Sequence, residues 1–225
     1  YNSIPSGNGV AADVVLGQAD MTSTSGNRGA GAAANTMNRP RGMAIAAGKL
    51  FVTDANNNRV LIWNSLPTVT GQAADVVLGQ LDFSGASTNQ GGGTSSTTLY
   101  QPVAVASDGV KLLVADRQNH RVLIWDNIPT VNDKAADWVI GQTNFSGNLP
   151  DQGSSTVANT FDNPSGLFLI NGKLLVADQE DDRVLLFNSV PTANNVSADI
   201  VLGQPTMSRN SSALGQNRLS TPQHI

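Results

Sequence analysis

The feature that most constrains the fold is a short segment that returns along the chain every 62 residues. Its copies begin at Asp13, Asp75, Asp137 and Asp199, and each has the form Asp-apolar-Val-apolar-Gly-Gln. A second motif, Arg59-Val-Leu-Ile-Trp63, keeps the same step and returns at Arg121 and Arg183. Self-similarity at a fixed spacing indicates one structural unit stacked several times. The repeat therefore defines a scaffold more closely than it defines a function.

The composition narrows the class of protein and its partners. Charged residues make up only 13% of the chain, about half the usual share of roughly 25%. This low charge, with many Gly, Ser, Thr and Asn residues, predicts a secreted or cell-surface protein. The net charge of −4 gives no electrostatic reason to bind nucleic acid. The chain has no Cys, which excludes disulfides and thiolate chemistry, and no apolar run approaches the roughly 18 residues that predict membrane insertion.

One unit, taken as residues 37–98, predicts four short strands and no substantial helix. In the segment Arg59 to Trp63, alternate side chains point to opposite faces, and both faces are apolar. Such a strand must be covered on both sides. Four-stranded antiparallel sheets packed between neighbouring sheets are typical of a β-propeller. The predicted strands are Met43–Ala47, Leu50–Asp54, Arg59–Trp63 and Ala74–Leu78.

The same residues resemble a known family of propeller repeats. Pro40-Arg-Gly-Met-Ala-Ile, Lys49-Leu-Phe-Val-Thr-Asp54 and Asn58-Arg-Val-Leu-Ile-Trp63 together resemble the NHL repeat, in an unusually long version. The copies from Pro102 to Trp125 and from Pro164 to Phe187 match equally well. The resemblance implies an all-β propeller of four-stranded antiparallel blades.

We expect one propeller segment over residues 1–225, incomplete at both ends. It divides into a partial blade at 1–36, blades at about 37–98, 99–160 and 161–218, and the start of a further blade at 219–225. Tyr1–Pro5 aligns with Trp63–Pro67, and Leu219–Ile225 aligns with Leu99–Val105. Either the chain is a piece of a longer propeller, or another chain completes its blades.

Ligand-binding residues are expected at the face where two sets of loops meet. The loops after the fourth strands and the hairpins between the second and third strands converge there, near a central channel. Residues just before the first strands should ring this channel, and they differ from copy to copy. The alternative is that they are solvated loop residues. The candidates are Arg39, Arg41, Tyr100, Gln101, Asp162 and Asn163, with His120 in a hairpin.

A recurrent set of charged residues is expected to be structural. Each Asp is predicted to cap its hairpin by accepting backbone N–H groups, with the Arg paired to it or to a neighbouring blade. A catalytic group is normally needed once, so recurrence in every blade argues against catalysis. The set comprises Asp54, Asp116, Asp178, Arg59, Arg121 and Arg183.

No catalytic or metal-binding residue is predicted, and no cofactor. Calcium at the hairpins is the alternative, favoured by the acidic run Asp178 to Asp182, although the Gly and Glu of an EF-hand loop are missing. Only His120 and His224 offer imidazole groups, which does not suit a zinc hydrolase.

The leading functional prediction is a non-enzymatic recognition or structural scaffold outside the cell. Its partner would be a protein, a glycan or a further copy in an assembly. The alternative, implied by relatives of this architecture, is a metal-dependent lyase or lactonase with a site in the central channel. RNA binding, known for some NHL propellers, is disfavoured by the acidic balance despite Arg28, Arg39 and Arg41.

Overall fold

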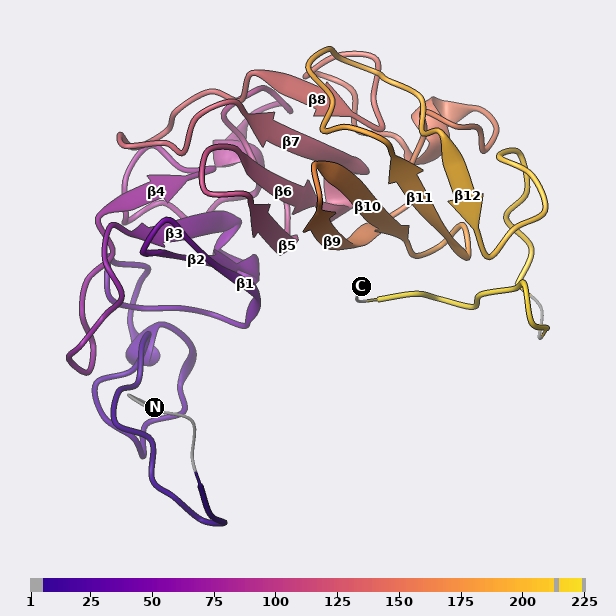
Figure 1. Cartoon of the computed structure of the whole chain (residues 1–225). Helices are drawn as coiled ribbons and strands as arrows, with labels where there is room; N and C mark the ends of the chain where they lie inside the picture. Colours follow the sequence, from indigo (N-terminus) through magenta and orange to yellow (C-terminus); the bar gives the residue numbers. More distant parts are fainter. Residues whose placement is uncertain (1–5, 213–214, 224–225) are drawn as a thin grey trace.

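The structure, a computed structural model, describes residues 6–212 and 215–223. Three four-stranded antiparallel sheets follow one another along an arc, with β1, β5 and β9 on its inner side (Figure 1). In each sheet the strand order follows the chain, which confirms the predicted all-β fold of four-stranded antiparallel blades. The first sheet contains β1 (Pro40–Ala46), β2 (Lys49–Asp54), β3 (Arg59–Trp63) and β4 (Val76–Leu78). The second contains β5 (Pro102–Ser107), β6 (Leu112–Asp116), β7 (Arg121–Trp125) and β8 (Trp138–Ile140), and the third β9 (Pro164–Ile170), β10 (Lys173–Asp178), β11 (Arg183–Phe187) and β12 (Ile200–Leu202).

The third strand of each blade is the best predicted element. Leu50 pairs with Trp63 and Asp54 pairs with Arg59, so the β2–β3 register matches the charged residues at the hairpin. The first and fourth strands were predicted less well. β1 begins at Pro40 and ends at Ala46, whereas the fourth strand begins only at Val76. Pairing thus reaches back to Pro40 in the inner strand and covers only three residues of the outer one, and apolar patterning reveals neither limit.

The two faces of each blade pack against different neighbours, as the apolar alternation predicts. In β3, Val60 and Ile62 join a core with residues of the second sheet, including Leu112 and Val114. Leu61 and Trp63 point into a separate core on the other side of the first sheet. Burying an aliphatic side chain of this kind stabilises the fold by about 1.5–3 kcal/mol.

The inner strands approach closely because of a glycine. A Cβ atom at Gly42 in β1 would lie 2.6 Å from the Val103 carbonyl oxygen and 2.9 Å from Ala104 Cα. Both atoms belong to the backbone of β5, which cannot move away without disturbing its own sheet. The sequence thus places a residue without a side chain where two blades meet on the inner side of the arc.

Helical structure among the described residues is restricted to short 3-10 turns. Two of them, η2 (Ala55–Asn57) and η4 (Arg117–Asn119), form the hairpins between second and third strands. The others lie in the loops: η1 (Gly26–Gly29) before β1, η3 (Thr88–Gly91) after β4 and η5 (Pro150–Gly153) after β8. In residues 6–212 and 215–223, no helical segment is long and apolar enough to cross a membrane.

Candidate functional site

Each blade is closed by a fully buried ion pair at the end of its second strand. In the second blade, Arg121 Nε donates to Asp116 Oδ2 at 2.8 Å, and both side chains are inaccessible to solvent. Arg121 also donates to the carbonyl oxygens of Ser95, Thr98 and Phe145 at 2.6–2.9 Å. One guanidinium therefore ties the hairpin to the loops on either side of the blade. The same ion pair is formed by Asp54 with Arg59 and by Asp178 with Arg183.

The backbone partner of these aspartates differs from the prediction. Each aspartate was predicted to accept N–H groups of its own hairpin. This prediction was wrong, because Asp54 Oδ1 accepts the N–H of Asn38, which precedes β1. Asp116 and Asp178 do the same with Tyr100 and Asp162. The pKa of each aspartate is raised overall, because the effect of burial exceeds the opposite effect of the charged arginine. The carboxylate thus joins the first strand of a blade to its hairpin, a link between segments that are distant in sequence.

A second recurrent contact joins each blade to the next through the last residue of the hairpin. That residue is in the left-handed conformation, and its side chain accepts a backbone N–H from the residue before the next proline. The bonds are Asn58 Oδ1 to Gln101 at 2.9 Å, His120 Nδ1 to Asn163 at 3.1 Å, and Asp182 Oδ1 to Thr221 at 2.7 Å. Gln101 and Asn163, predicted to ring the channel, therefore serve as donors in the contact between blades.

His120 is a neutral acceptor in this contact. Its Nδ1 lies 3.1 Å from Asp162 Oδ1 as well as 3.1 Å from the Asn163 nitrogen. A protonated ring would pair with Asp162 but would lose the N–H of Asn163. Burial lowers the pKa of His120, and the equivalent residues, Asn58 and Asp182, accept the same N–H. Both observations favour the unprotonated Nδ1.

Of the residues predicted to ring the channel, only Arg41 lines a hollow on the inner side of the arc. Arg39 is exposed and lines a different depression beside β1. Tyr100 and Asp162 offer their N–H groups to the buried aspartates. Burial and the charges of nearby acids raise the pKa of Asp162. A binding role for these residues stays a prediction.

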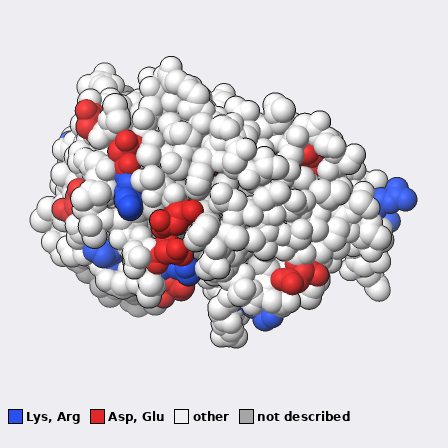
Figure 2. Space-filling model, turned by 90° about the horizontal axis from the view of Figure 1, so that it is seen from above, with Lys and Arg blue, Asp and Glu red and all other residues white. Residues whose placement is uncertain are grey.

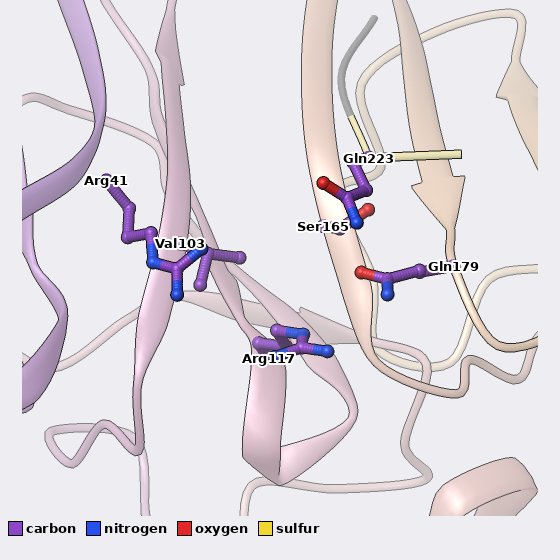
Figure 3. A pocket seen from close by; sticks show the side chains of 6 residues that line it. All are labelled: Arg41, Val103, Arg117, Ser165, Gln179 and Gln223. Carbon is purple, nitrogen blue, oxygen red and sulfur yellow. The ribbon is translucent and has the colours of Figure 1, made fainter. Parts of the chain in front are cut away.

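The hollow around Arg41 is formed by two positions of the repeat. It has a volume of about 230 Å³. One position is the residue after the proline that opens each first strand, and the other is the first residue of each hairpin. Arg41 lies on one side, Ser165, Gln179 and Gln223 on the other, and Val103 and Arg117 between them (Figure 3). We call these six residues the channel pocket: Arg41, Val103, Arg117, Ser165, Gln179 and Gln223.

Of these six residues, only Arg41 was named as a candidate from the sequence, although the hairpins that begin at Arg117 and Gln179 were placed at the expected ligand face. A signal was present, because the residue after the proline is Arg41, Val103, Ser165 and Gln223 in successive copies. Four different side chains at one position, between nearly constant neighbours, indicate that packing does not dictate the residue there.

The channel pocket is polar and carries positive charge. Its lining includes two guanidinium groups, two amides and a hydroxyl, and no carboxylate. The nearest acid to Arg117 is Glu180, whose Oε1 lies 3.9 Å from Arg117 Nη2. Elsewhere charge is sparse, and most of the face in Figure 2 carries neither basic nor acidic side chains. Guanidinium and amide donors arranged around a small hollow suit a carboxylate.

Among residues 6–212 and 215–223, no group of three or more His, Asp or Glu side chains is arranged to hold a metal ion. The predicted alternative of calcium at the hairpins is not supported by a ligand set in this part of the chain. His224, the other imidazole, lies outside the described residues.

In comparisons with known proteins, the NHL repeat family matches residues 37–63. This segment runs from the residues before β1 to the end of β3. The resemblance predicted from the sequence is thereby confirmed for this blade. No curated protein matches the chain. NHL repeats form propeller domains that generally mediate protein interactions and are generally non-catalytic.

Proposed function

We propose that the chain is a non-enzymatic recognition scaffold, secreted or at the cell surface, that binds an acidic segment of a partner protein in the channel pocket. The observation that carries this proposal is the pair Arg41 and Arg117, which face a common hollow lined by no carboxylate. No hydrogen bond or ion pair of the described chain engages Arg41, so its guanidinium is available to a ligand. Among the described residues Arg117 forms one ion pair, with Glu180 at 3.9 Å, and its charge also acts on the carboxyl of Asp162.

The way the repeat is built supports recognition. Buried ion pairs and backbone links recur in each blade and hold the sheets, so the pocket positions are free to vary. An interaction surface needs such positions, because specificity comes from a few charged and polar groups on a rigid frame. The low charge content and the absence of Cys are the support for a site of action outside the cytoplasm. We propose that the scaffold needs no cofactor.

Binding of a fluorescent, blocked peptide of alternating Glu and Gly residues tests the proposal, with a Gln–Gly peptide as its neutral counterpart. We expect the wild type to bind the acidic peptide in preference to the neutral one, with affinity that falls as salt rises. Replacing both Arg41 and Arg117 by Ala should weaken binding by about tenfold or more, since each tenfold loss corresponds to about 1.4 kcal/mol.

Arg39→Asn is the matched control, because it removes a nearby positive charge that does not line the channel pocket. Arg39 has a φ of 54°, and Asn tolerates this conformation. Binding unchanged in the double alanine variant, or equal for both peptides, would refute the proposal. Binding of an oligo-uronate without binding of the acidic peptide would replace the protein partner by an acidic glycan.

A further inference from the structure

The third blade departs from the other two at a buried contact between a loop and a hairpin. In the first blade, the side-chain amides of Asn27 and Asn57 bond to each other in both directions, at 3.0 and 2.8 Å. Asn89 and Asn119 repeat this in the second blade, at 3.2 and 2.9 Å. In the third blade both positions are acids, Asp151 in η5 and Asp181 in the β10–β11 hairpin.

The exchange removes donors that the contact requires. An amide both donates and accepts, whereas an ionised carboxylate only accepts. Asn57 also donates to Asp54 Oδ2 at 2.7 Å, the same oxygen that accepts from Arg59 in the buried ion pair. Asp181 stands against Asp178 in the corresponding place. The third blade therefore brings three carboxyl groups together where the others have one carboxylate and two amides.

The donors that remain serve Asp151 and Asp178 rather than Asp181. Thr160 Oγ1 donates to Asp151 Oδ1 at 2.7 Å, and Arg183 Nε donates to Asp178 Oδ2 at 2.8 Å. The hydroxyl of Thr156 lies 2.9 Å from Asp151 Oδ2 and 3.2 Å from Asp181 Oδ1, but its single hydrogen serves one of them. Arg183 Nη2 lies 3.1 Å from Asp181 Oδ2, without the alignment of a hydrogen bond. Asp181 is 1% exposed, and its Oδ2 has no hydrogen-bond partner among the described residues.

We propose that this contact is a proton-dependent clasp: a proton on Asp181 replaces the missing amide hydrogen and joins the loop at Asp151 to the hairpin. When the proton leaves, the neighbouring carboxylates repel one another and the contact loosens. The hairpin also supplies Gln179 to the channel pocket and Asp182 to the link with Thr221. Loss of the proton therefore disturbs the pocket and the junction with the following segment.

The charges around the clasp agree with proton uptake. Asp178 and Arg183 face Asp181 from β10 and β11, and Asp151 faces it from η5. The pKa of Asp181 is raised to about 6: burial is the main cause and the charge of Asp151 adds to it, while Arg183 and the hydrogen bonds with Asp178 and Thr156 act in the opposite direction. Two further titratable groups interact with Asp151. Its negative charge acts to raise the pKa of both His120 and Asp162.

Titration of the aspartate carboxyl carbons by NMR tests the clasp directly in the wild-type chain. We expect the carboxyl of Asp181, assigned by the loss of its signal in the variants below, to titrate near pH 6. The buried Asp54, Asp116 and Asp178 also have raised pKa values, and their signals remain in those variants. The matched variant is Asp151→Asn with Asp181→Asn, which installs the amide pair of the other blades; Asp181→Asn alone is the second variant. The folded pKa is raised, so protonation stabilises the fold at low pH, and this stabilisation is lost as pH rises from about 4 to about 6. The thermal midpoint of the wild type should fall across that window relative to the double variant.

Hydrogen exchange adds a local readout. Amides in residues 149–160 should exchange faster at pH 7.5 than at pH 5 in the wild type, after correction for intrinsic rates, and not in the double variant. The clasp is refuted if Asp181 does not titrate above pH 5, or if wild type and double variant show parallel pH profiles. A saturable stabilisation by calcium at pH 7, absent in the double variant, would assign the cluster to a cation instead and would also overturn it.

Discussion

Arg121→Met breaks the buried ion pair of the second blade, and its cost follows from four hydrogen bonds. The guanidinium donates to Asp116 at 2.8 Å and to the carbonyl groups of three loop residues. Methionine fills much of the same space but donates nothing. Asp116 is left as a buried carboxylate without its counter-charge, and three carbonyl oxygens, of which that of Thr98 lies in a buried contact, lose a donor.

Removing one partner of a buried ion pair costs about 3–5 kcal/mol. The lost carbonyl contacts fall within this range, since the measured cost includes the groups left without partners. Asp116→Asn combined with Arg121→Met should recover part of the loss, because the isolated charge is then gone. Lys111→Met is the control: it breaks the partly exposed pair with Asp126, and pairs at the surface contribute about 0–1 kcal/mol.

Urea unfolding followed by tryptophan fluorescence measures these differences. Trp125 lies at the end of β7, is 1% exposed and reports on the packing of the same blade. We expect the unfolding midpoint to fall much further for Arg121→Met than for Lys111→Met. If the two variants lose the same stability, or if the double variant is no more stable than Arg121→Met, the buried pair does not hold the blade as argued.

Two further predictions concern the contacts between blades. Gly42→Val should cost about 1–3 kcal/mol by forcing β1 away from the β5 backbone, whereas Gly31→Ala, at a site with no atom within 4 Å, should change the thermal midpoint little; equal midpoints for the two variants would exclude the close approach as a constraint. His120→Asn keeps an acceptor for Asn163 but cannot be protonated. Because burial lowers the pKa of His120, its contribution to stability is complete above its unfolded pKa of about 6.5 and is lost as pH falls below that value. The variant should therefore gain stability relative to the wild type on going from pH 7.5 to pH 5 in thermal unfolding, and parallel curves would contradict the assignment.

The fold was predictable because its information is local and repeated. Apolar runs such as Arg59 to Trp63 are short, apolar on both faces and bounded by turn residues. These features predict both a β-strand and its packing against neighbouring sheets on both faces. The partner of Asp54 was not predictable in the same way. From the local sequence, an aspartate at a hairpin is expected to accept N–H groups of its own turn. In the folded blade it accepts instead the N–H of Asn38, which lies 16 residues earlier in the chain.

The channel pocket was predicted only in part because side-chain direction depends on irregularities of pairing. The β1–β2 register shifts between Pro40 and Met43, and this shift decides how the residue after the proline is presented. Arg39 and Gln101 adopt φ values of 54° and 48°, a conformation uncommon for such residues. Nothing in their identity indicates it, so they were placed in the channel ring together with Arg41.

Some positions of the repeat connect the blades, and others line the channel pocket. Arg41, Val103 and Ser165 occupy one backbone position with three different chemistries, while the adjoining strands keep their pairing. Under the proposed function, we expect changes there to alter what the pocket binds at little cost to the fold. Asp181, which stands where the other copies have Asn57 and Asn119, belongs to the positions that connect the blades. Its partner Asp178 is buried and cannot reach solvent. A charge introduced at such a buried position must be neutralised within the protein. The two exchanges that place Asp151 and Asp181 in the third blade therefore make its loop–hairpin contact depend on pH, whereas the amide pairs at this place in the other two blades do not titrate.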